Sequence, residues 1–219
     1  MSLLPEVAQA ALLTLTATAS AIWIGTARRG YGEPDQPSLF CALLAFVLAA
    51  GTGACALARL AFGHDALEAQ LWLQQATLML GLPLVGVVAL TLGRKWIWSR
   101  PTWGRVLLGL CVFFEMARQF GWSEPYALGL GLVSAGLVFY AGLLQWPARR
   151  QAIAGLLGSL LMLASMSWPG LPPLGAALAD QLLLSQALAC PILAWLLLNL
   201  PGHLREPGDV AEQKAPEHP

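Results

Sequence analysis

The sequence predicts an all-α, polytopic membrane protein that forms a bundle of seven transmembrane helices, and its composition is the first reason. The chain has 219 residues, of which 57% are hydrophobic and only 11% are charged. A soluble domain carries about 25% charged residues, so this chain has too few charges to keep a folded surface in water. A helix crosses the hydrocarbon core with about 20 apolar residues. Seven such helices with short connectors fill a single membrane domain at residues 1–200.

Seven apolar stretches define the expected spans, and the connectors between them contain Pro, Gly or charged residues. Proline and glycine at these positions are typical of helix ends. The expected spans are 6–27, 38–62, 70–93, 104–122, 125–146, 152–170 and 174–200. The segment 201–219 is rich in Pro, Glu and Gly and cannot bury enough apolar surface to order itself. We therefore expect a flexible cytoplasmic tail there.

The positions of lysine and arginine set the expected orientation. Of the 12 Lys and Arg residues, only Arg59 and Arg118 lie outside the tail and the connectors that follow the first, third and fifth spans. The positive-inside rule then places the N-terminus outside and the C-terminus in the cytoplasm. This arrangement requires an odd number of spans, which agrees with seven. Low lysine content, abundant Ala, Leu and Arg and short connectors favour a bacterial inner-membrane protein.

The stretch FFEMARQFGW, residues 113–122, places three polar side chains in an otherwise apolar span. Charge at membrane depth is costly unless it is paired or reaches water. Glu115 and Arg118 are three residues apart and share a helix face, so they can pair with each other. Gln119 lies four residues from Glu115 on the same side. We expect the three to face the bundle interior or to reach the outer interface.

Further polar residues are expected in the outer half of the bundle. Gln74 lies early in the third span, and Asp180 and Gln181 lie at the start of the seventh. The candidate ligand-binding set is therefore Glu115, Arg118, Gln119, Gln74, Asp180 and Gln181. Polar stripes on the first, third, fourth and seventh spans fit a water-accessible cavity that opens outward. Hydrogen bonds between helices or snorkelling to the lipid interface explain the same stripes, and these alternatives stay open.

Small residues and prolines give two local expectations. Pro83 and Pro191 lie inside the third and seventh spans and predict kinks. Small residues at four-residue spacing predict close helix packing. They are Ala50, Ala54 and Ala58 in the second span and Ala127, Gly131 and Ala135 in the fifth.

The sequence predicts no cofactor, because it lacks the residues that the cofactors of known seven-helix membrane proteins require. The two lysines, Lys95 and Lys214, lie in a connector and in the tail, so a retinal Schiff base in the seventh span is excluded. The set His64, Asp65 and Glu68 is at most a weak metal site, because it has too few ligands for a histidine-rich zinc centre. The chain has no basic stripe, so we expect no nucleic-acid partner.

Three functions remain. The first is a non-enzymatic membrane protein that binds a small or amphiphilic molecule in an outward-facing polar cavity, as a sensor, carrier or chaperone. The second is a structural or assembly subunit of a larger membrane complex, with another membrane protein as its partner. The third is an intramembrane enzyme in which Glu115 and Asp180 act as an acid–base pair. All three place the chain in a lipid bilayer, and the first adds a small-molecule or lipid ligand.

Overall fold

The computed structural model describes residues 3–166 and 181–200, and its elements within these residues are helices. They are α1 (Leu3–Ala27), α2 (Gln36–Phe62), α3 (Leu67–Ala76), α4 (Leu82–Gly93), α5 (Arg100–Gln119), α6 (Ser123–Leu143), α7 (Arg149–Ala164) and α9 (Leu182–Asn199). A π-helical segment, Thr77–Gly81, joins α3 and α4 into one rod. The predicted all-α class is confirmed, and each expected span overlaps one of these helices. The expected tail, the end of the sixth expected span and the start of the seventh lie outside the described residues.

Five helices in the described part of the chain are long and apolar enough to cross a membrane. They are α1, α2, the rod formed by α3 and α4, α6 and α9. The two remaining helices differ from these in composition or length. Helix α5 contains four charged residues, Arg100, Arg105, Glu115 and Arg118, and α7 has 16 residues. By the length and composition of its helices, the chain is a multi-pass membrane protein.

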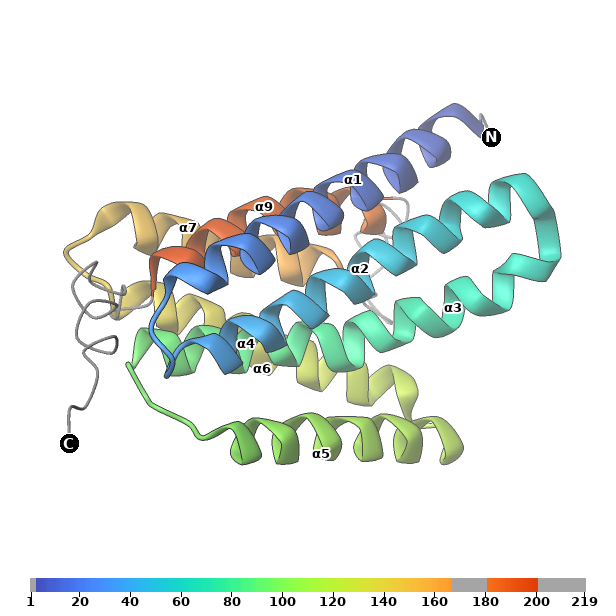
Figure 1. The fold of residues 1–219 in the computed structure, drawn as a ribbon. Coiled ribbons are helices and arrows are strands. Elements are labelled where there is room, and N and C mark those ends of the chain that lie inside the picture. The colour runs from blue at the N-terminus through green and yellow to red at the C-terminus, as the bar shows by residue number, and fades with distance from the viewer. Residues whose placement is uncertain (1–2, 167–180, 201–219) are drawn as a thin grey trace, which may run out of the picture.

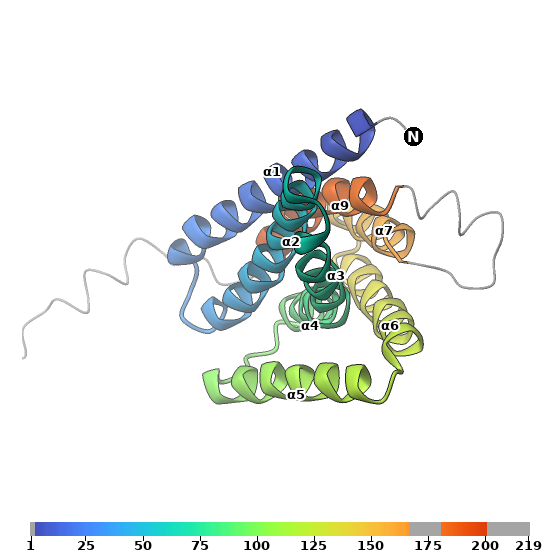
Figure 2. The same cartoon turned by 90° about the vertical axis from the view of Figure 1, so that its right-hand side faces the viewer.

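Six of the helices form a closed ring of neighbours, and α5 lies outside it (Figures 1 and 2). In the ring, α1 packs on α2, α2 on α4, α4 on α6, α6 on α7, α7 on α9 and α9 on α1. The interior is aliphatic, with fully buried side chains that include Leu13, Ile24, Leu39, Val88, Val138 and Leu197. Helix α5 contacts mainly the π-helical segment, α2 and α6. It therefore packs on the ring without being part of it.

Glycines allow the backbones of neighbouring helices in the ring to come into van der Waals contact. A Cβ atom added at Gly53 of α2 would lie 2.6 Å from Thr14 Oγ1 and 2.8 Å from the Thr14 backbone nitrogen. Between α6 and α7, a Cβ at Gly142 would lie 2.9 Å from the Gly155 Cα. Membrane helices pack in this way because small residues allow close van der Waals contact between backbones.

The predicted small-residue faces are right in α6 and displaced by one residue in α2. In α6, Gly131 and Ala135 are buried, and Gly131 faces Met166. In α2, Ala54 is exposed, and the close contact with α1 is made by its neighbour Gly53. A shift of one residue moves a side chain by about 100° around a helix, so the predicted face of α2 is partly turned away from α1.

The expected kink at Pro83 takes the form of a widened turn. The backbone N–H of Leu82 bonds to the carbonyl of Thr77, five residues earlier, within the segment that precedes Pro83. Proline lacks an N–H and crowds the carbonyl four residues before it, here that of Met79, and a π-helical turn relieves this conflict. The Thr77 hydroxyl is buried there, 2.8 Å from the hydroxyl of Thr52 on α2. Helix α9 continues through Pro191.

The two ends of the bundle differ in charge. The connectors after α1, α4 and α6, together with the first turns of α5 and α7, lie at one end, which we call the basic end (Figure 1). Its described cations are Arg28, Arg29, Arg94, Lys95, Arg100, Arg105, Arg149 and Arg150, and its acids are Glu33 and Asp35. The opposite, acidic end has the cations Arg59 and Arg118 and acids that include Glu6, Glu68, Glu115 and Glu124.

Candidate functional site

Glu115, Arg118 and Gln119 form the pairing that their spacing predicts. Arg118 donates from Nη2 to Glu115 Oε1 at 2.8 Å and from Nε to Glu115 Oε2 at 3.0 Å. Gln119 Nε2 donates to the same Oε1 atom at 3.0 Å. The Glu115 and Arg118 side chains are 41% and 48% exposed. The three therefore lie on the exposed surface of α5, with the carboxylate held by its own neighbours.

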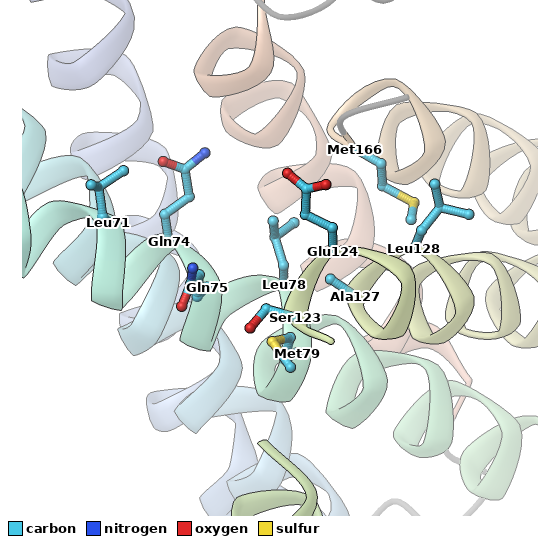
Figure 3. A pocket seen from close by; sticks show the side chains of 10 residues that line it. All are labelled: Leu71, Gln74, Gln75, Leu78, Met79, Ser123, Glu124, Ala127, Leu128 and Met166. Atoms are coloured by element: carbon cyan, nitrogen blue, oxygen red, sulfur yellow. The ribbon is translucent and has the colours of Figure 1, made fainter. Parts of the chain in front are cut away.

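A cavity of about 200 Å³ lies at the acidic end, between α3 and the start of α6 (Figure 3). Four of its lining residues are polar: Gln74, Gln75, Ser123 and Glu124. The others are apolar: Leu71, Leu78, Met79, Ala127, Leu128 and Met166. Figure 3 shows Gln74 on α3 and Glu124 on α6, at two sides of this space. The polar groups thus come from two helices that are far apart in sequence.

The turn between α5 and α6 positions Ser123 and Glu124. Gly121 has a φ of 71°, a conformation that glycine adopts at little cost. The Trp122 N–H bonds to the Ala117 carbonyl at 2.9 Å, as in a Schellman motif. Helix α6 begins directly afterwards and runs back along the ring, so Glu124 lies in its first turn. The positive end of the helix dipole stabilises a carboxylate at that position.

The other wall of the cavity comes from α3 and the π-helical segment. Gln74 is half-buried near the end of α3, and Gln75 beside it is exposed. Leu78 and Met79 follow within the widened turn and line the same cavity. Widened turns of this kind are frequent at functional sites in helical proteins.

The structure brings only part of the predicted set together. Gln74 lines the cavity, whereas the Glu115, Arg118 and Gln119 side chains are not among its lining residues. Gln181 is exposed just before α9 and is also not among them. Asp180 lies outside the described residues. The set of six therefore remains a prediction, with one member in the cavity.

Three polar residues that line the cavity lie outside the predicted set: Gln75, next to the predicted Gln74, and Ser123 and Glu124 at the start of α6. The signal was the sequence GWSEP, in which glycine marks the end of one helix and a carboxylate opens the next. Glu124 lines the cavity because α6 packs against the π-helical segment that follows α3, and a single sequence does not show this contact.

The hydroxyl groups of the expected polar stripe on α1 are satisfied within their own helix. Thr16 Oγ1 donates to the Leu12 carbonyl at 2.8 Å, and Ser20 Oγ donates to the Thr16 carbonyl at 2.7 Å. At the start of the same helix, Glu6 forms an ion pair with Arg59 of α2 at 3.3 Å. The Glu6–Arg59 pair matches the alternative of bonds between helices, whereas the Thr16 and Ser20 hydroxyls bond within α1 and join no second helix.

Within the described residues, no group of three His, Cys, Asp or Glu side chains is placed to hold a metal ion. Glu68 lies in the first turn of α3. The side chains of His64 and Asp65 are not described, so the weak metal site at His64, Asp65 and Glu68 stays a prediction.

Comparison with protein-family models, curated proteins and solved structures gives no match to this chain. The geometry of the helices and cavities is therefore the basis for a functional assignment.

Proposed function

We propose that this chain is a seven-span inner-membrane protein that binds a small or amphiphilic molecule in the cavity between α3 and α6. Its N-terminus is outside and its C-terminus is in the cytoplasm. One observation supports the binding function: a single cavity with apolar walls is also lined by Gln74, Gln75 and Glu124. The Glu124 side chain is exposed in the first turn of α6, at the end of the bundle, so its carboxylate is accessible to a ligand that enters this cavity.

Two features support α5 as a span, although its composition is less apolar. Its 20 residues give a length of about 30 Å, which is the thickness of the hydrocarbon core. Its charged residues lie within its first six and last five positions, and the nine residues 106–114 between them carry no charge. Side chains at these positions reach the two interfaces by snorkelling.

The charge difference between the ends supports the orientation. The basic end is assigned to the cytoplasm by the positive-inside rule. The cavity then opens at the outer side of the membrane.

The size and charge of the cavity limit the ligand. Pockets for drug-sized molecules measure about 300–1,000 Å³, so about 200 Å³ accommodates a small molecule or the head of an amphiphile. Glu124 is the one charged residue among the described residues that line it. A protonated amine would pair with this carboxylate and donate to the Gln74 and Gln75 amide oxygens. We therefore expect a cationic or amine-bearing ligand to bind in preference to an acid.

Binding of three single-chain amphiphiles tests this function. Dodecylamine, dodecanol and dodecanoic acid differ only in their polar group, and native mass spectrometry of the purified protein measures saturable binding of each. We expect dodecylamine to bind most tightly and Glu124→Gln to weaken its binding about tenfold, because a bond to a charged group contributes about 1.5–3 kcal/mol. Glu68→Gln removes a carboxylate that does not line the cavity and should leave binding unchanged.

Filling the cavity gives a second test that does not depend on charge. Ala127→Trp places a large ring among the lining residues, whereas Leu132→Trp adds the same ring at an exposed position of α6. Binding should be lost only in Ala127→Trp. Equal binding in both variants, or no saturable binding of any of the three amphiphiles, would refute the proposed site.

A further inference from the structure

A second cavity lies at the opposite, basic end of the bundle, where α5 stands away from α2. Its volume is about 420 Å³. Its polar lining includes Arg28, Gln36 and Arg100, and its apolar lining includes Phe40, Trp103 and Leu107. The residues come from the 3-10 turn Arg28–Gly30 that follows α1, the first turns of α2 and the first turns of α5. This cavity shares no residue with the one that contains Glu124.

The two arginines that line this cavity are accessible to an anion. Arg28 is half-buried, with its guanidinium 5.1 Å from the centre of the Phe40 ring. Arg100 pairs with Glu33 at 3.0 Å, but both side chains are more than 70% exposed, and exposed pairs of this kind are weak. A smaller opening of about 340 Å³ beside it is lined by Arg28, Arg29 and Gln36. No Asp or Glu is among the described residues that line either opening.

The walls of the cavity suit a lipid more than a soluble anion. Phe40 is 44% exposed, and Leu108 on the adjoining face of α5 is 66% exposed. A Cβ atom at Gly104 would meet nothing within 4 Å, so the wall of α5 is open at that position. From this position an acyl chain can pack against apolar surface along α5. A free phosphate would gain nothing from that surface.

Trp103 adds an unsatisfied donor to the same wall. Its side chain is 3% exposed and packs against Trp98, with 5.3 Å between ring centres. Its indole N–H has no acceptor among the described residues. Buried polar groups are rarely left without a partner, and an oxygen-bearing ligand in the cavity would supply one.

We propose that this cavity binds the phosphate-bearing headgroup of an anionic phospholipid. Arg28 and Arg100 contact the phosphate, Gln36 donates to the headgroup, and one acyl chain lies along Phe40 and Leu107. Basic openings between transmembrane helices at the membrane surface bind anionic headgroups in this way. The other described cations at this end attract anionic lipid to the surface without contacting the bound molecule.

Lipid titration of the purified full-length protein, followed by native mass spectrometry, tests the proposal. The three arms are phosphatidylglycerol, phosphatidylcholine with the same acyl chains, and inorganic phosphate. We expect phosphatidylglycerol to bind at least about tenfold more tightly than phosphatidylcholine, because the two arginines attract an anionic headgroup more strongly than a zwitterionic one. Inorganic phosphate should neither bind tightly nor displace the lipid. Displacement by inorganic phosphate would assign the site to a free anion and overturn the lipid.

Two double variants separate the cavity from general surface charge. Arg28→Gln with Arg100→Gln removes the cavity cations, and Arg149→Gln with Arg150→Gln removes the same charge from the start of α7. We expect the first pair to weaken phosphatidylglycerol binding at least about tenfold and the second by less than about twofold. Equal losses in the two variants would overturn the proposal in favour of diffuse attraction.

Gly104→Leu provides a test that keeps every charge. The added side chain enters the open space beside Gly104, so it should reduce phosphatidylglycerol binding without altering thermal stability. This variant is decisive even if the arginine variants fold poorly. Binding equal to that of the unmodified protein would show that lipid does not occupy the cavity.

Discussion

Helices α2 and α5 run between the same two ends of the bundle but pack in opposite ways. Helix α2 meets α1 at backbone distance through Gly53, and its Thr52 hydroxyl is buried against Thr77. Helix α5 contacts the ring through side chains, chiefly Phe114 and Ala117, which join a small cluster with Ala76 and Met79. Figure 2 shows the resulting separation of α5 from the ring.

This difference bears on where the proposed sites lie. Backbone contact at Gly53 leaves no space for a molecule at that point, although nearer the basic end an apolar opening of about 660 Å³ lies between α1 and α2, lined by Ile22, Leu43 and Val47 among others. Both proposed sites border α5 or the turn that follows it: the basic cavity lies between α5 and α2, and Ser123 and Glu124 follow the turn after α5. Each proposed site therefore lies next to the weakly packed helix or to the turn that follows it, and has at least one wall on the more tightly packed helices.

The largest expected effect comes from disrupting the contact between α1 and α2. Gly53→Leu places a side chain where the Thr14 backbone nitrogen is 2.8 Å from the new Cβ. We expect a loss of about 3 kcal/mol in stability, the upper part of the usual range for overpacking. Gly109→Leu on α5 is the matched control, because a Cβ there meets nothing within 4 Å. Thermal unfolding in detergent measures both, and equal stability of the two variants would contradict the difference in packing.

The contact that attaches α5 to the ring is expected to be the next most sensitive. The Phe114 ring is 5% exposed and meets Trp72 edge-on, with 5.8 Å between ring centres. Phe114→Ala should cost about 2 kcal/mol, less than for a core phenylalanine in water, since lipid is as apolar as the site that is lost.

Phe113→Ala is the control for this contact, because Phe113 is 56% exposed. Proteolysis at the ends of α5 should increase only in Phe114→Ala. If Phe113→Ala were equally destabilised, α5 would not be attached through Phe114.

A smaller effect, with a defined pH dependence, is expected at Tyr31 in the connector between α1 and α2. Its hydroxyl donates to the Leu198 carbonyl at 2.6 Å, and burial together with the Asp35 carboxylate raises the pKa of the phenol above its ordinary value. Tyr31→Phe should cost about 1 kcal/mol near neutral pH.

The raised pKa of Tyr31 determines the sign of the pH effect. The unfolded phenol ionises near pH 10, before the folded one does. The stability due to Tyr31 is therefore complete below about pH 10 and is lost as the pH rises through the folded pKa. The stability of Tyr31→Phe relative to the unmodified protein should increase over this range. A constant difference in unfolding temperature would argue against a buried, protonated phenol.

The helices were predictable because long apolar runs and Pro- or Gly-containing connectors are local signals. Boundaries differ by a few residues: α2 begins at Gln36, since a proline such as Pro37 is tolerated in a first turn. The position of α5 outside the ring was not predictable, because the order of helices along the chain does not specify which of them are neighbours. For the same reason Gln74 was identified without Glu124. The spacing of Glu115 and Arg118 did predict their pairing, because it depends on one helix alone.

Whether α5 crosses the membrane is decided by the side of the membrane on which each of its ends lies. In a background lacking Cys41, Cys55, Cys111 and Cys190, single cysteines replace Ile97 before α5 and Trp122 after it, which are 64% and 68% exposed. A membrane-impermeant maleimide is applied to intact and to permeabilised cells. If α5 spans the membrane with its basic end inside, Trp122→Cys is labelled in intact cells and Ile97→Cys is labelled only after permeabilisation. Labelling of both from the same side would show that α5 does not cross the membrane, and would contradict the seven-span arrangement.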